Sequence, residues 1–454
     1  MTEPRHTHPV TPLVTMVRAA PVLIIGIFVT GGGEATHFLG GLGTGGLILL
    51  ILIGVGVYAF FSWTRLTFFY DDDGDLRINS GVFVRNERRV QLSRLQSVDV
   101  TQPILARLFG LAELRPEVAG ASSEGTKLQY LALEDAQQLR AELLARASGL
   151  RQEEGVPVAT APEQVLVQVP SPHLLASLVL QPSTVFLLLL IPTVVAVAGV
   201  AGLWELGITG IFLVFAPVTV VGGQFLKYFG FTVAQSPDGL RLRFGLTSHR
   251  SQTVPPGRVQ AVRIERPLMW KPWGWVRVIV NVAGATGGEE GEDRPSVILP
   301  VAPLPVARAL LQQVLPGVDP FSVVLTSAPA AARWRAPLQH KQLAVGATST
   351  VFVTRRGWLV PKWDVVPHAR TQSVRLRQGP WQRRLGLASV FVDSTPGPVS
   401  IAALYQDAGA ARVLAQEQTD RAGLARRQAG PGQSESHPVG PPIAPDPGNG
   451  ADLP

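Results

Sequence analysis

A threefold internal repeat constrains the fold of this chain more than any other feature of its sequence. Each copy begins at a glycine, and an arginine follows at position 13, a glutamine at 15, a basic residue at 26 and a second glycine at 29. The residues at these positions are Gly81, Arg94, Gln96, Arg107 and Gly110 in the first copy; Gly245, Arg258, Gln260, Lys271 and Gly274 in the second; and Gly357, Arg370, Gln372, Arg383 and Gly386 in the third. Identical spacing without a gap predicts three copies of one structural unit.

Within each copy, apolar and polar side chains alternate as they do in half-buried β-strands. In the second copy, the alternating residues 231–233 and 240–244 flank an Asp-Gly pair, which is a hairpin signal between two such runs. Each copy closes with an amphipathic helical pattern, clearest at residues 133–144. The repeated unit is therefore predicted to consist of about six or seven strands followed by one helix.

Two long apolar regions stand ahead of the first and second units. Each contains a single charged residue, Glu34 within 19–64 and Glu205 within 164–226. A membrane-spanning helix needs about 20 apolar residues. Each region therefore predicts a hairpin, with helices at about 17–37 and 42–63 and at about 174–201 and 206–226. A buried soluble core is the alternative, and the short apolar part of the first helix leaves open whether that helix spans fully.

The distribution of cations predicts the orientation of both hairpins. Their short loops carry Glu34 and Glu205 but neither Lys nor Arg, whereas Arg18, Arg65 and Lys227 flank the apolar regions. Cytoplasmic segments are enriched in Lys and Arg. The units are thus predicted to lie in the cytoplasm, on a multi-pass protein of the cell (inner, cytoplasmic) membrane. A cleavable signal peptide is disfavoured because no small-residue cleavage site follows the first helix.

These patterns predict an alternation of hairpins and units along the chain, ending in a polar tail rich in Pro, Gly and Ser. The predicted parts are an N-terminal cytoplasmic tail (1–16), hairpin 1 (17–64), repeat 1 (65–150), a linker (151–172), hairpin 2 (173–227), repeat 2 (228–317), a second linker (318–341), repeat 3 (342–418) and a disordered tail (419–454). No apolar hairpin precedes the third repeat. The second linker is instead predicted to lie on the membrane surface.

The order of hairpin and unit, together with the pattern Gly…Arg-x-Gln-(Ser/Ala)-Val…(Arg/Lys)-x-x-Gly, resembles the bacterial membrane-flanked domain family. Its repeat is classed as a bacterial pleckstrin-homology-like (PH-like) domain, and the larger, multi-repeat YdbT-type members are the most similar. The resemblance covers about residues 15–418. It implies a fold of membrane α-helical hairpins plus α+β units, each a curved antiparallel sheet or partly open barrel capped by a C-terminal helix.

Basic charge increases along the three units. Residues 65–152 hold as many acidic as basic residues, residues 227–320 have a net charge of +4, and residues 330–418 reach +8. Trp next to Lys or Arg suits a bilayer interface. The candidate lipid or partner contacts are therefore Trp270, Lys271 and Trp273 in the second unit and Trp381, Arg383 and Arg384 in the third. An ordinary helical turn packed on the sheet is the alternative, and the repeated Gly, Arg and Gln positions are interpreted as mostly structural.

Enzyme chemistry is not predicted. The chain has no cysteine, which excludes disulfides and thiolate metal sites. Its eight histidines do not show the helical spacing beside a glutamate that zinc sites use, and neither a nucleophile elbow nor a phosphate-binding loop is present. We therefore expect no catalytic residue, no cofactor and no metal. Nucleic-acid binding is also disfavoured, because no recognition-helix or aromatic-ribbon signature is present.

The sequence thus predicts a polytopic membrane scaffold whose cytoplasmic PH-like repeats bind lipid headgroups or partner proteins. An oligomeric transporter, or an accessory subunit of a membrane transport or export complex, is the alternative, although the predicted spans lack an ionisable residue near mid-bilayer. The family resemblance implies a shorter single-repeat relative, or self-association, as the partnership. It also implies a role in envelope stress or in resistance to membrane-active agents. Whether the three units pack together stays open at this stage.

Overall fold

The computed structural model describes residues 5–14, 16–17, 43–72, 74–82, 84–118, 128–147, 164–200, 207–236, 239–255, 257–283, 297–315 and 318–433. Almost all of the first predicted membrane helix lies outside these residues, as do residues 434–454 of the predicted tail. The described residues form three modules; each contributes four strands to one sheet and three strands to another, and ends in a C-terminal helix. All of the strand pairings within and between the modules are antiparallel.

Module 1 follows the predicted order of strands and helix. Its four-stranded sheet consists of β1 (Arg5–His6), β2 (Thr67–Tyr70), β3 (Leu76–Ser80) and β4 (Asn86–Val90), with α3 (Gly43–Arg65) before β2. Its second half consists of η1 (Leu92–Arg94), β5 (Leu95–Pro103), α4 (Ile104–Leu108), β6 (Leu111–Val118), β7 (Leu128–Ala132) and α5 (Leu133–Ala147). Apolar side chains from both sheets and from α5 form one core cluster.

Module 2 repeats this plan with an apolar helical hairpin near its start. Its first half consists of β8 (Gln164–Gln168), α6 (Ser171–Val179), α7 (Pro182–Val200), α8 (Gly207–Tyr228), β9 (Thr232–Ser236), β10 (Gly239–Phe244) and β11 (Ser248–Val254). Its second half consists of β12 (Val259–Glu265), η3 (Leu268–Trp273), β13 (Trp275–Val282), β14 (Val297–Pro303) and α9 (Leu304–Val314).

Module 3 has two short 3-10 helices where module 2 has its hairpin. Its first half consists of β15 (Thr326–Ser327), η4 (Ala330–Trp334), η5 (His340–Gln342), β16 (Ala344–Ala347), β17 (Val351–Arg356) and β18 (Lys362–Pro367). Its second half consists of η6 (His368–Arg370), β19 (Ser373–Arg377), α10 (Pro380–Arg384), β20 (Leu387–Asp393), β21 (Ile401–Asp407) and α11 (Ala408–Gln433).

The first strand of each module precedes the inserted helices, which corrects the predicted boundaries. β8 lies in the predicted linker 151–172 and pairs with β9, although α6, α7 and α8 separate the two strands in sequence. β1 likewise lies in the predicted N-terminal tail and β15 in the second linker. The segment 164–168 has only five residues and is flanked by polar sequence. Its alternation of apolar and polar residues was therefore too short to distinguish a strand from a linker. The hairpin is therefore inserted between two neighbouring strands of one sheet.

The C-terminal helix also departs from the prediction. The disordered tail was expected from residue 419, whereas α11 continues to Gln433. Its inner face buries Gln418 and Ala422 against the module, and Gln418 Nε2 donates a hydrogen bond of 3.0 Å to Thr371 Oγ1. These tertiary contacts are consistent with a helix that continues beyond residue 418. The polar composition of this part of the chain resembles that of the tail and did not predict the continuation.

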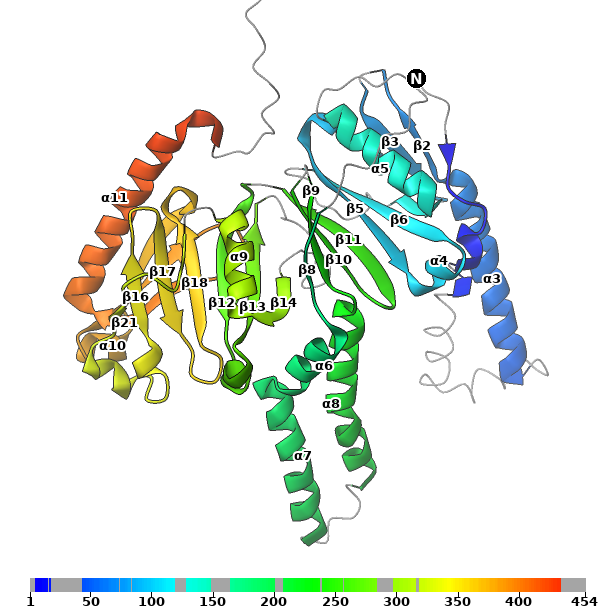
Figure 1. Ribbon diagram of the computed structural model, residues 1–454. Helices are drawn as coiled ribbons and strands as arrows, with labels where there is room; N and C mark the ends of the chain where they lie inside the picture. The colour runs from blue at the N-terminus through cyan, green and yellow to red at the C-terminus, as the bar shows by residue number, and fades with distance from the viewer. Residues whose placement is uncertain are drawn as a thin grey trace, which may run out of the picture.

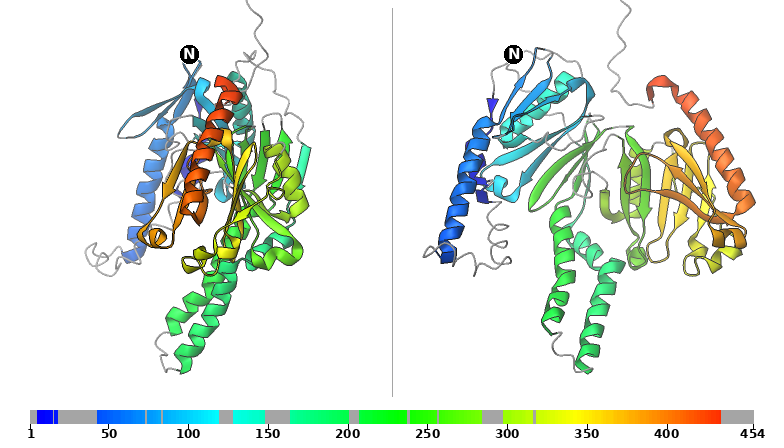
Figure 2. Two further views of the ribbon diagram at one scale, coloured as in Figure 1. Left: turned by 90° about the vertical axis from the view of Figure 1, so that its left-hand side faces the viewer. Right: turned by 180° about the vertical axis from the view of Figure 1, so that it is seen from behind.

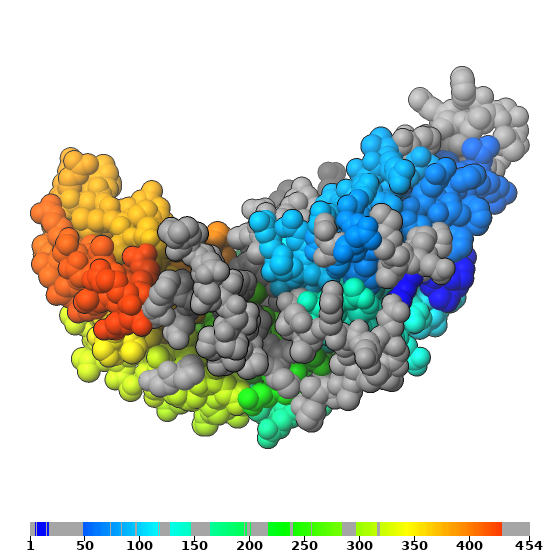
Figure 3. Space-filling model, turned by 90° about the horizontal axis from the view of Figure 1, so that it is seen from above, coloured from blue at the N-terminus to red at the C-terminus, as the bar shows by residue number. Residues whose placement is uncertain are grey.

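Neighbouring modules are joined edge to edge through their sheets. The three-stranded half of module 1 continues into the four-stranded half of module 2 in the order β7-β6-β5-β11-β10-β9-β8. Modules 2 and 3 are joined in the same way, in the order β14-β13-β12-β18-β17-β16-β15. Seen from above, the modules follow an arc from the N-terminal to the C-terminal one (Figure 3). The units therefore pack together as one array.

Both junctions use the same strand register. Counted from the first glycine of each repeat, position 6 of the later module faces position 19 of the earlier one. Ser251 faces Val100 across β11 and β5, and Trp363 faces Ile264 across β18 and β12. A one-residue slip would move every side chain to the opposite face of the sheet. The shared register shows that the junction is itself part of the repeated design.

The repeated glycines and glutamines occupy special backbone positions. Gly81, Gly245 and Gly357 have φ between 93° and 108°, and a Cβ there would collide with a carbonyl oxygen of the following turn. The second glycine of each repeat ends the short helical segment with φ near 65°. Gln260 lies at a β-bulge, where the register shifts between Val259 and Ala261. These positions set the turns and the bend of each module.

The apolar helices extend to one side of the array (Figures 1 and 2). Helices α3, α6 with α7, and α8 correspond to the helices predicted at 42–63, 174–201 and 206–226. Among the described residues, no single helix combines the length and hydropathy of a membrane span, but 171–179 and 182–194 do so together, bent by 54° at the break. The predicted membrane hairpins therefore stay a prediction.

Candidate functional site

The side of the array from which α7 and α8 project also carries the short helices that follow the first strand of each three-stranded sheet. Figure 1 shows α4 and α10 at this end of their sheets. Segment η3 lies at the same end, because Trp270 Nε1 donates a hydrogen bond of 3.0 Å to the carbonyl oxygen of Ser177 in α6. We call this side the lower face, as it is oriented in Figure 1.

The lower face exposes large apolar side chains from every module. Trp273 and Trp381, two of the predicted contacts, are 52% and 68% exposed. Other exposed apolar residues on η3, α4, η4 and the adjacent turns are Ile104, Leu108, Phe109, Met269, Trp334, Leu338, Trp358 and Leu359. Exposed apolar side chains that are grouped on one face of a protein often mark a surface that binds a protein or a membrane.

Trp270 does not belong to this surface. Its side chain is fully buried in the core of module 2, edge-on to Trp275, and Arg277 lies over its ring. It therefore cannot contact a headgroup in this structure, which corrects the prediction for this residue. The alternative considered for this segment, a helical turn packed on the sheet, therefore applies to Trp270. Trp273 is exposed on the same turn, and its ring stacks on that of Trp275 at a centroid distance of 5.4 Å.

The remaining predicted contacts combine aromatic rings with cations. Lys271 is exposed beside Trp273, and Arg383 and Arg384 are exposed on α10. The guanidinium of Arg384 lies 5.7 Å from the centre of the Trp381 ring. In the predicted surface segment of module 3, Arg333 lies 5.4 Å from the ring of Trp334. An aromatic ring with a cation above it can contact both the acyl boundary and an anionic headgroup.

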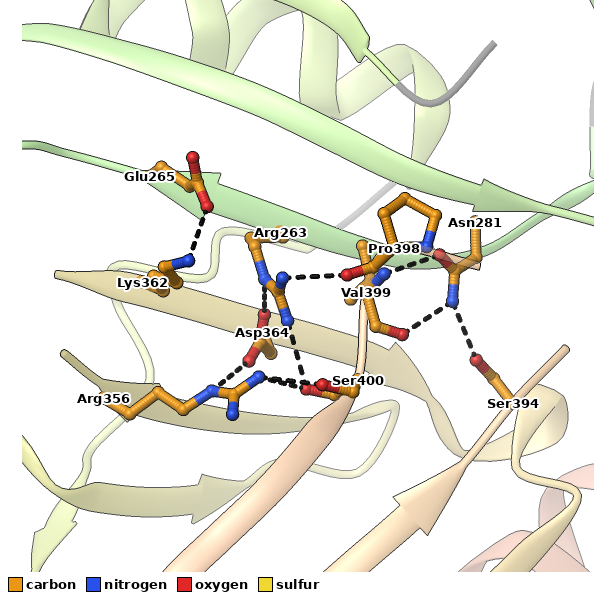
Figure 4. Close-up of polar contacts among 10 residues, drawn as sticks. All are labelled: Arg263, Glu265, Asn281, Arg356, Lys362, Asp364, Ser394, Pro398, Val399 and Ser400. Carbon is orange, nitrogen blue, oxygen red and sulfur yellow. Dashed lines mark hydrogen bonds and ion pairs between the residues drawn. The ribbon is translucent and has the colours of Figure 1, made fainter. Parts of the chain in front are cut away.

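A second polar centre lies at the junction of modules 2 and 3 (Figure 4). Asp364 on β18 is fully buried and accepts hydrogen bonds from Arg263 Nε at 2.5 Å and from Arg356 Nε at 3.0 Å. Both guanidinium groups also donate to the carbonyl oxygen of Ser400, at 3.2 and 2.6 Å. A further bond of 2.8 Å joins Arg263 to the carbonyl oxygen of Pro398. One carboxylate thus holds an arginine from each module.

Asn281 extends this network to the loop between β20 and β21 (Figure 4). Its amide nitrogen donates to the carbonyl oxygen of Val399 at 2.8 Å, and its amide oxygen accepts from the Val399 N–H at 2.9 Å. The amide nitrogen also lies 3.4 Å from Ser394 Oγ. Nearer the surface, Lys362 on β18 and Glu265 on β12 form an ion pair of 3.0 Å. Buried polar groups that are mutually satisfied specify one arrangement of the junction.

Side-chain hydrogen bonds also cross the first junction, between modules 1 and 2. Arg140 on α5 donates to the carbonyl oxygen of Val98 at 2.9 Å and to Thr253 Oγ1, in the next module, at 2.9 Å. Arg107 donates to the carbonyl oxygen of Leu246 at 3.3 Å. His249 lies on the pairing strand β11, and burial lowers the pKa of its imidazole. This junction therefore holds a neutral histidine near pH 7.

Comparison with known proteins decides the family. The sequence profile described as Bacterial PH domain matches residues 20–147, 186–318 and 314–419, one match for each module. The chain belongs to the bacterial PH domain family. The family resemblance drawn from the repeat is thereby confirmed, as are three PH-like units with antiparallel sheets. These PH modules account for most of the chain.

A curated relative has a similar extent. The chain is 21% identical over 337 residues to the UPF0699 transmembrane protein YdbT of Bacillus subtilis (strain 168), which covers 66% of this chain and 67% of that protein. The name describes that relative as a transmembrane protein.

The junction residues of these PH modules were missed by reasoning from the sequence. Arg263 stands between two apolar residues of an alternating strand, a pattern typical of an exposed side chain, whereas only 8% of it is exposed. The signal was present at position 18 of each repeat, where Asp99, Arg263 and Arg375 place a charge between two apolar residues. Alternation indicates which face a side chain occupies, but it does not reveal whether a neighbouring module covers that face.

Proposed function

We propose that this PH-domain protein is a membrane-anchored scaffold whose lower face contacts anionic lipid headgroups. The observation that carries the proposal is the position of Trp273, Trp334 and Trp381. All three are exposed, they come from elements at the end of the array from which the apolar hairpin projects, and basic side chains lie beside them. A membrane entered by the hairpin would meet this face first.

The point of insertion of α6, α7 and α8 supports an anchor of this kind. The hairpin leaves the sheet after β8 and returns to it at β9, and these two strands are hydrogen-bonded neighbours. Both ends of the hairpin therefore lie at the same edge of one module. A hairpin that enters and leaves a bilayer on the same side has this requirement, and the positive flanks predict that side to be the cytoplasm.

Charge supports the docking of module 3, which has η4 and η5 in place of a hairpin. This module carries the largest basic excess, with 12 basic and 4 acidic residues between 330 and 418. A basic side chain near an anionic leaflet gains about 1 kcal/mol, and the gain decays within a Debye length of about 8 Å. Because the modules share a continuous sheet, the anchor of module 2 would keep module 3 close to the same leaflet.

The test compares lipid contact of the full chain in two kinds of nanodisc. The protein is reconstituted in neutral phosphatidylcholine or in phosphatidylcholine with anionic phosphatidylglycerol, and hydrogen exchange is followed across residues 379–386. We expect slower exchange in the anionic nanodiscs. Arg383→Ala with Arg384→Ala should remove the difference because it removes the exposed cations of α10.

A matched double variant controls for the loss of charge. Arg426 and Arg427 are exposed on the part of α11 that lies away from the lower face (Figure 1). Arg426→Ala with Arg427→Ala removes the same charge and should leave the lipid-dependent protection intact. Equal exchange in neutral and anionic nanodiscs, or equal effects of the two double variants, would overturn the proposal of headgroup contact.

A further inference from the structure

The repeated junction leaves one pairing edge open at the C-terminal end of the array. The first strand of the three-stranded sheet pairs with the next module in both earlier cases, β5 with β11 and β12 with β18. The equivalent strand of module 3 is β19, which pairs with β20 on one side and ends its sheet. Among the described residues, no strand pairs with the other edge of β19.

In the two earlier modules, the apolar side chains of the paired strand are more buried than those of β19. Leu376 on β19 is 42% exposed, whereas its equivalents Val100 and Ile264 are 7% and 0% exposed. Val374, two residues earlier on the same face, is partly exposed, while Val262 is fully buried. An open edge with exposed apolar side chains is the form in which sheets accept a further strand.

We propose that β19 pairs with an antiparallel strand of a PH-like module on a different protein chain. The register of the two internal junctions defines that strand, because it specifies which residues would face β19. An apolar residue would face Val374, another would face Leu376, and an acidic residue between them would face Arg375.

The chemistry follows from the second junction. There Val365 faces Val262, Trp363 faces Ile264, and Asp364 between them faces Arg263. Arg375 occupies the position of Arg263 in the third repeat. It binds Asp393 through Nε and Nη2, and Nη1 takes no part in this pair.

Arg377 adds a second cation on the same strand. It lies two residues beyond Arg375, on the same face of β19, with its guanidinium 5.6 Å from the ring of Phe391. The two charged side chains of β19 are thus both basic. A strand that carries acidic side chains would complement their charge.

A second copy of this chain fits the edge poorly. In the described residues, β4 is the edge strand that corresponds to β11 and β18, and the shared register would place Arg88 opposite Arg375 and Glu87 opposite Leu376. Like charges directly across two strands are destabilising, and a carboxylate would face an apolar side chain. Two copies of β19 would also bring their arginines together. The charges therefore favour a different chain over self-association.

The test is photocrosslinking in the native cell from a photoreactive residue at position 376 of the full chain. We expect an adduct to one other membrane-associated protein, with the crosslinked residue next to an acidic residue in a predicted strand of a PH-like module. A photoreactive residue at Glu87, on the open edge of β4, is the matched control and should give no such adduct. An adduct to a second copy of this chain, or no adduct at all, overturns the proposal.

Charge reversal tests the pairing itself. Arg375→Glu should lower the adduct yield about tenfold, as loss of a cross-strand ion pair does, and reversal of the facing acidic residue to Arg in the partner should restore it. Arg426→Glu makes the same charge change away from the edge and should leave the yield unchanged. Equal yields for the two variants, or no rescue, would contradict the stated register.

Two further measurements keep the outcome clear. In the purified chain alone, the outward amides of β19 should exchange at least about tenfold faster than those of β12, and unchanged melting of Arg375→Glu shows that the module still folds. Equal exchange on both strands would mean that the edge is already covered and would overturn the proposal. The lipid-contact variants at Arg383 and Arg384 should leave the adduct unchanged, so this inference stands or falls independently of headgroup contact.

Discussion

Arg263 and Asp364 face each other across the seam between modules 2 and 3, with Nε and Oδ1 2.5 Å apart. The Asp364 side chain is fully buried, and only 9% of the Arg263 side chain is exposed. Two neighbouring PH modules are therefore connected by a desolvated ion pair in addition to their continuous sheet. Removing one partner of such a pair leaves a buried charge without compensation, which costs far more than the pair itself contributes.

Replacement of Asp364 should destabilise the second junction. Asp364→Asn leaves Arg263 and Arg356 with a neutral acceptor, and we expect a loss of about 3–5 kcal/mol in the free energy of unfolding of this part of the array. Hydrogen exchange of β12 and β18 in the full chain measures it. Glu265→Gln, which removes the more exposed ion pair on the same two strands, is the matched control and should cost about 1 kcal/mol or less. Equal effects would show that burial does not distinguish the two pairs.

A double replacement separates charge compensation from packing. Arg263→Met combined with Asp364→Leu removes both charges, so the double variant should be more stable than either single one. Arg356 also binds Asp364, and the remaining cost of the double variant should therefore disappear when Arg356→Met is added. Additive losses in all three variants would contradict a shared network. The measurement is again exchange of the amides in β12 and β18.

Gly357→Ala should strain the turn that begins the third repeat signature. Its φ is 93°, and an added Cβ would collide with the carbonyl oxygen of Val360. We expect a loss of about 1–3 kcal/mol, seen as a lower melting temperature. Gly379→Ala is the control, because Gly379 has φ of −78° and its added Cβ would be 3.9 Å from the nearest side chain. A melting temperature unchanged by Gly357→Ala would show that the turn can rearrange.

Acidification should weaken module 3 through His368. Its ring is buried, Nε2 bonds to the carbonyl oxygen of Thr348 at 3.0 Å, and burial lowers the pKa of the imidazole. The unfolded chain then binds a proton more readily than the folded one. Stability is therefore full above about pH 6.5 and falls as the pH drops below that value. The melting temperature measured between about pH 5.5 and 8 should show this slope.

Replacement of His368 assigns the pH dependence. His368→Gln should reduce the slope of melting temperature against pH for module 3, because it removes the buried imidazole. His249 at the first junction also has a lowered pKa because of burial, so its contribution should appear in module 2 instead. A slope that His368→Gln leaves intact in module 3 would assign it to another group.

Trp270 and Trp273 lie in the same short segment but should respond differently to replacement. Trp270→Phe removes the hydrogen bond to Ser177 and leaves a buried carbonyl oxygen without that donor, which should cost about 1–3 kcal/mol. Trp273→Phe keeps an exposed ring and should change stability by less than about 0.5 kcal/mol. Thermal melting of the full chain in detergent measures both. A larger loss for Trp273 would mean that the exposed tryptophan carries the packing of the segment.

The sequence was sufficient to predict the repeat, the hairpin turns and the apolar helices, because each depends on local spacing. The threefold recurrence of Gly, Arg and Gln at identical positions identified the family without any structure, and the helices expected at 42–63, 174–201 and 206–226 have counterparts in the fold. The candidate contacts at Trp273, Lys271, Trp381, Arg383 and Arg384 are exposed. Local pattern thus predicted the repeated turns, the apolar helices and the exposed positions of these amphipathic segments.

Only the tertiary structure decided which strands pair and what covers each face. Residues 164–168 form the first strand of module 2, although a helical hairpin separates them from their neighbour in the sheet. Trp270 and Trp273 lie three residues apart with similar chemistry, yet packing against Ser177 buries only the first. Arg263 is buried because β18 of another module lies beside it, whereas Arg375 at the same repeat position is exposed. Burial depends on contacts distant in sequence, and alternation along one strand cannot encode them.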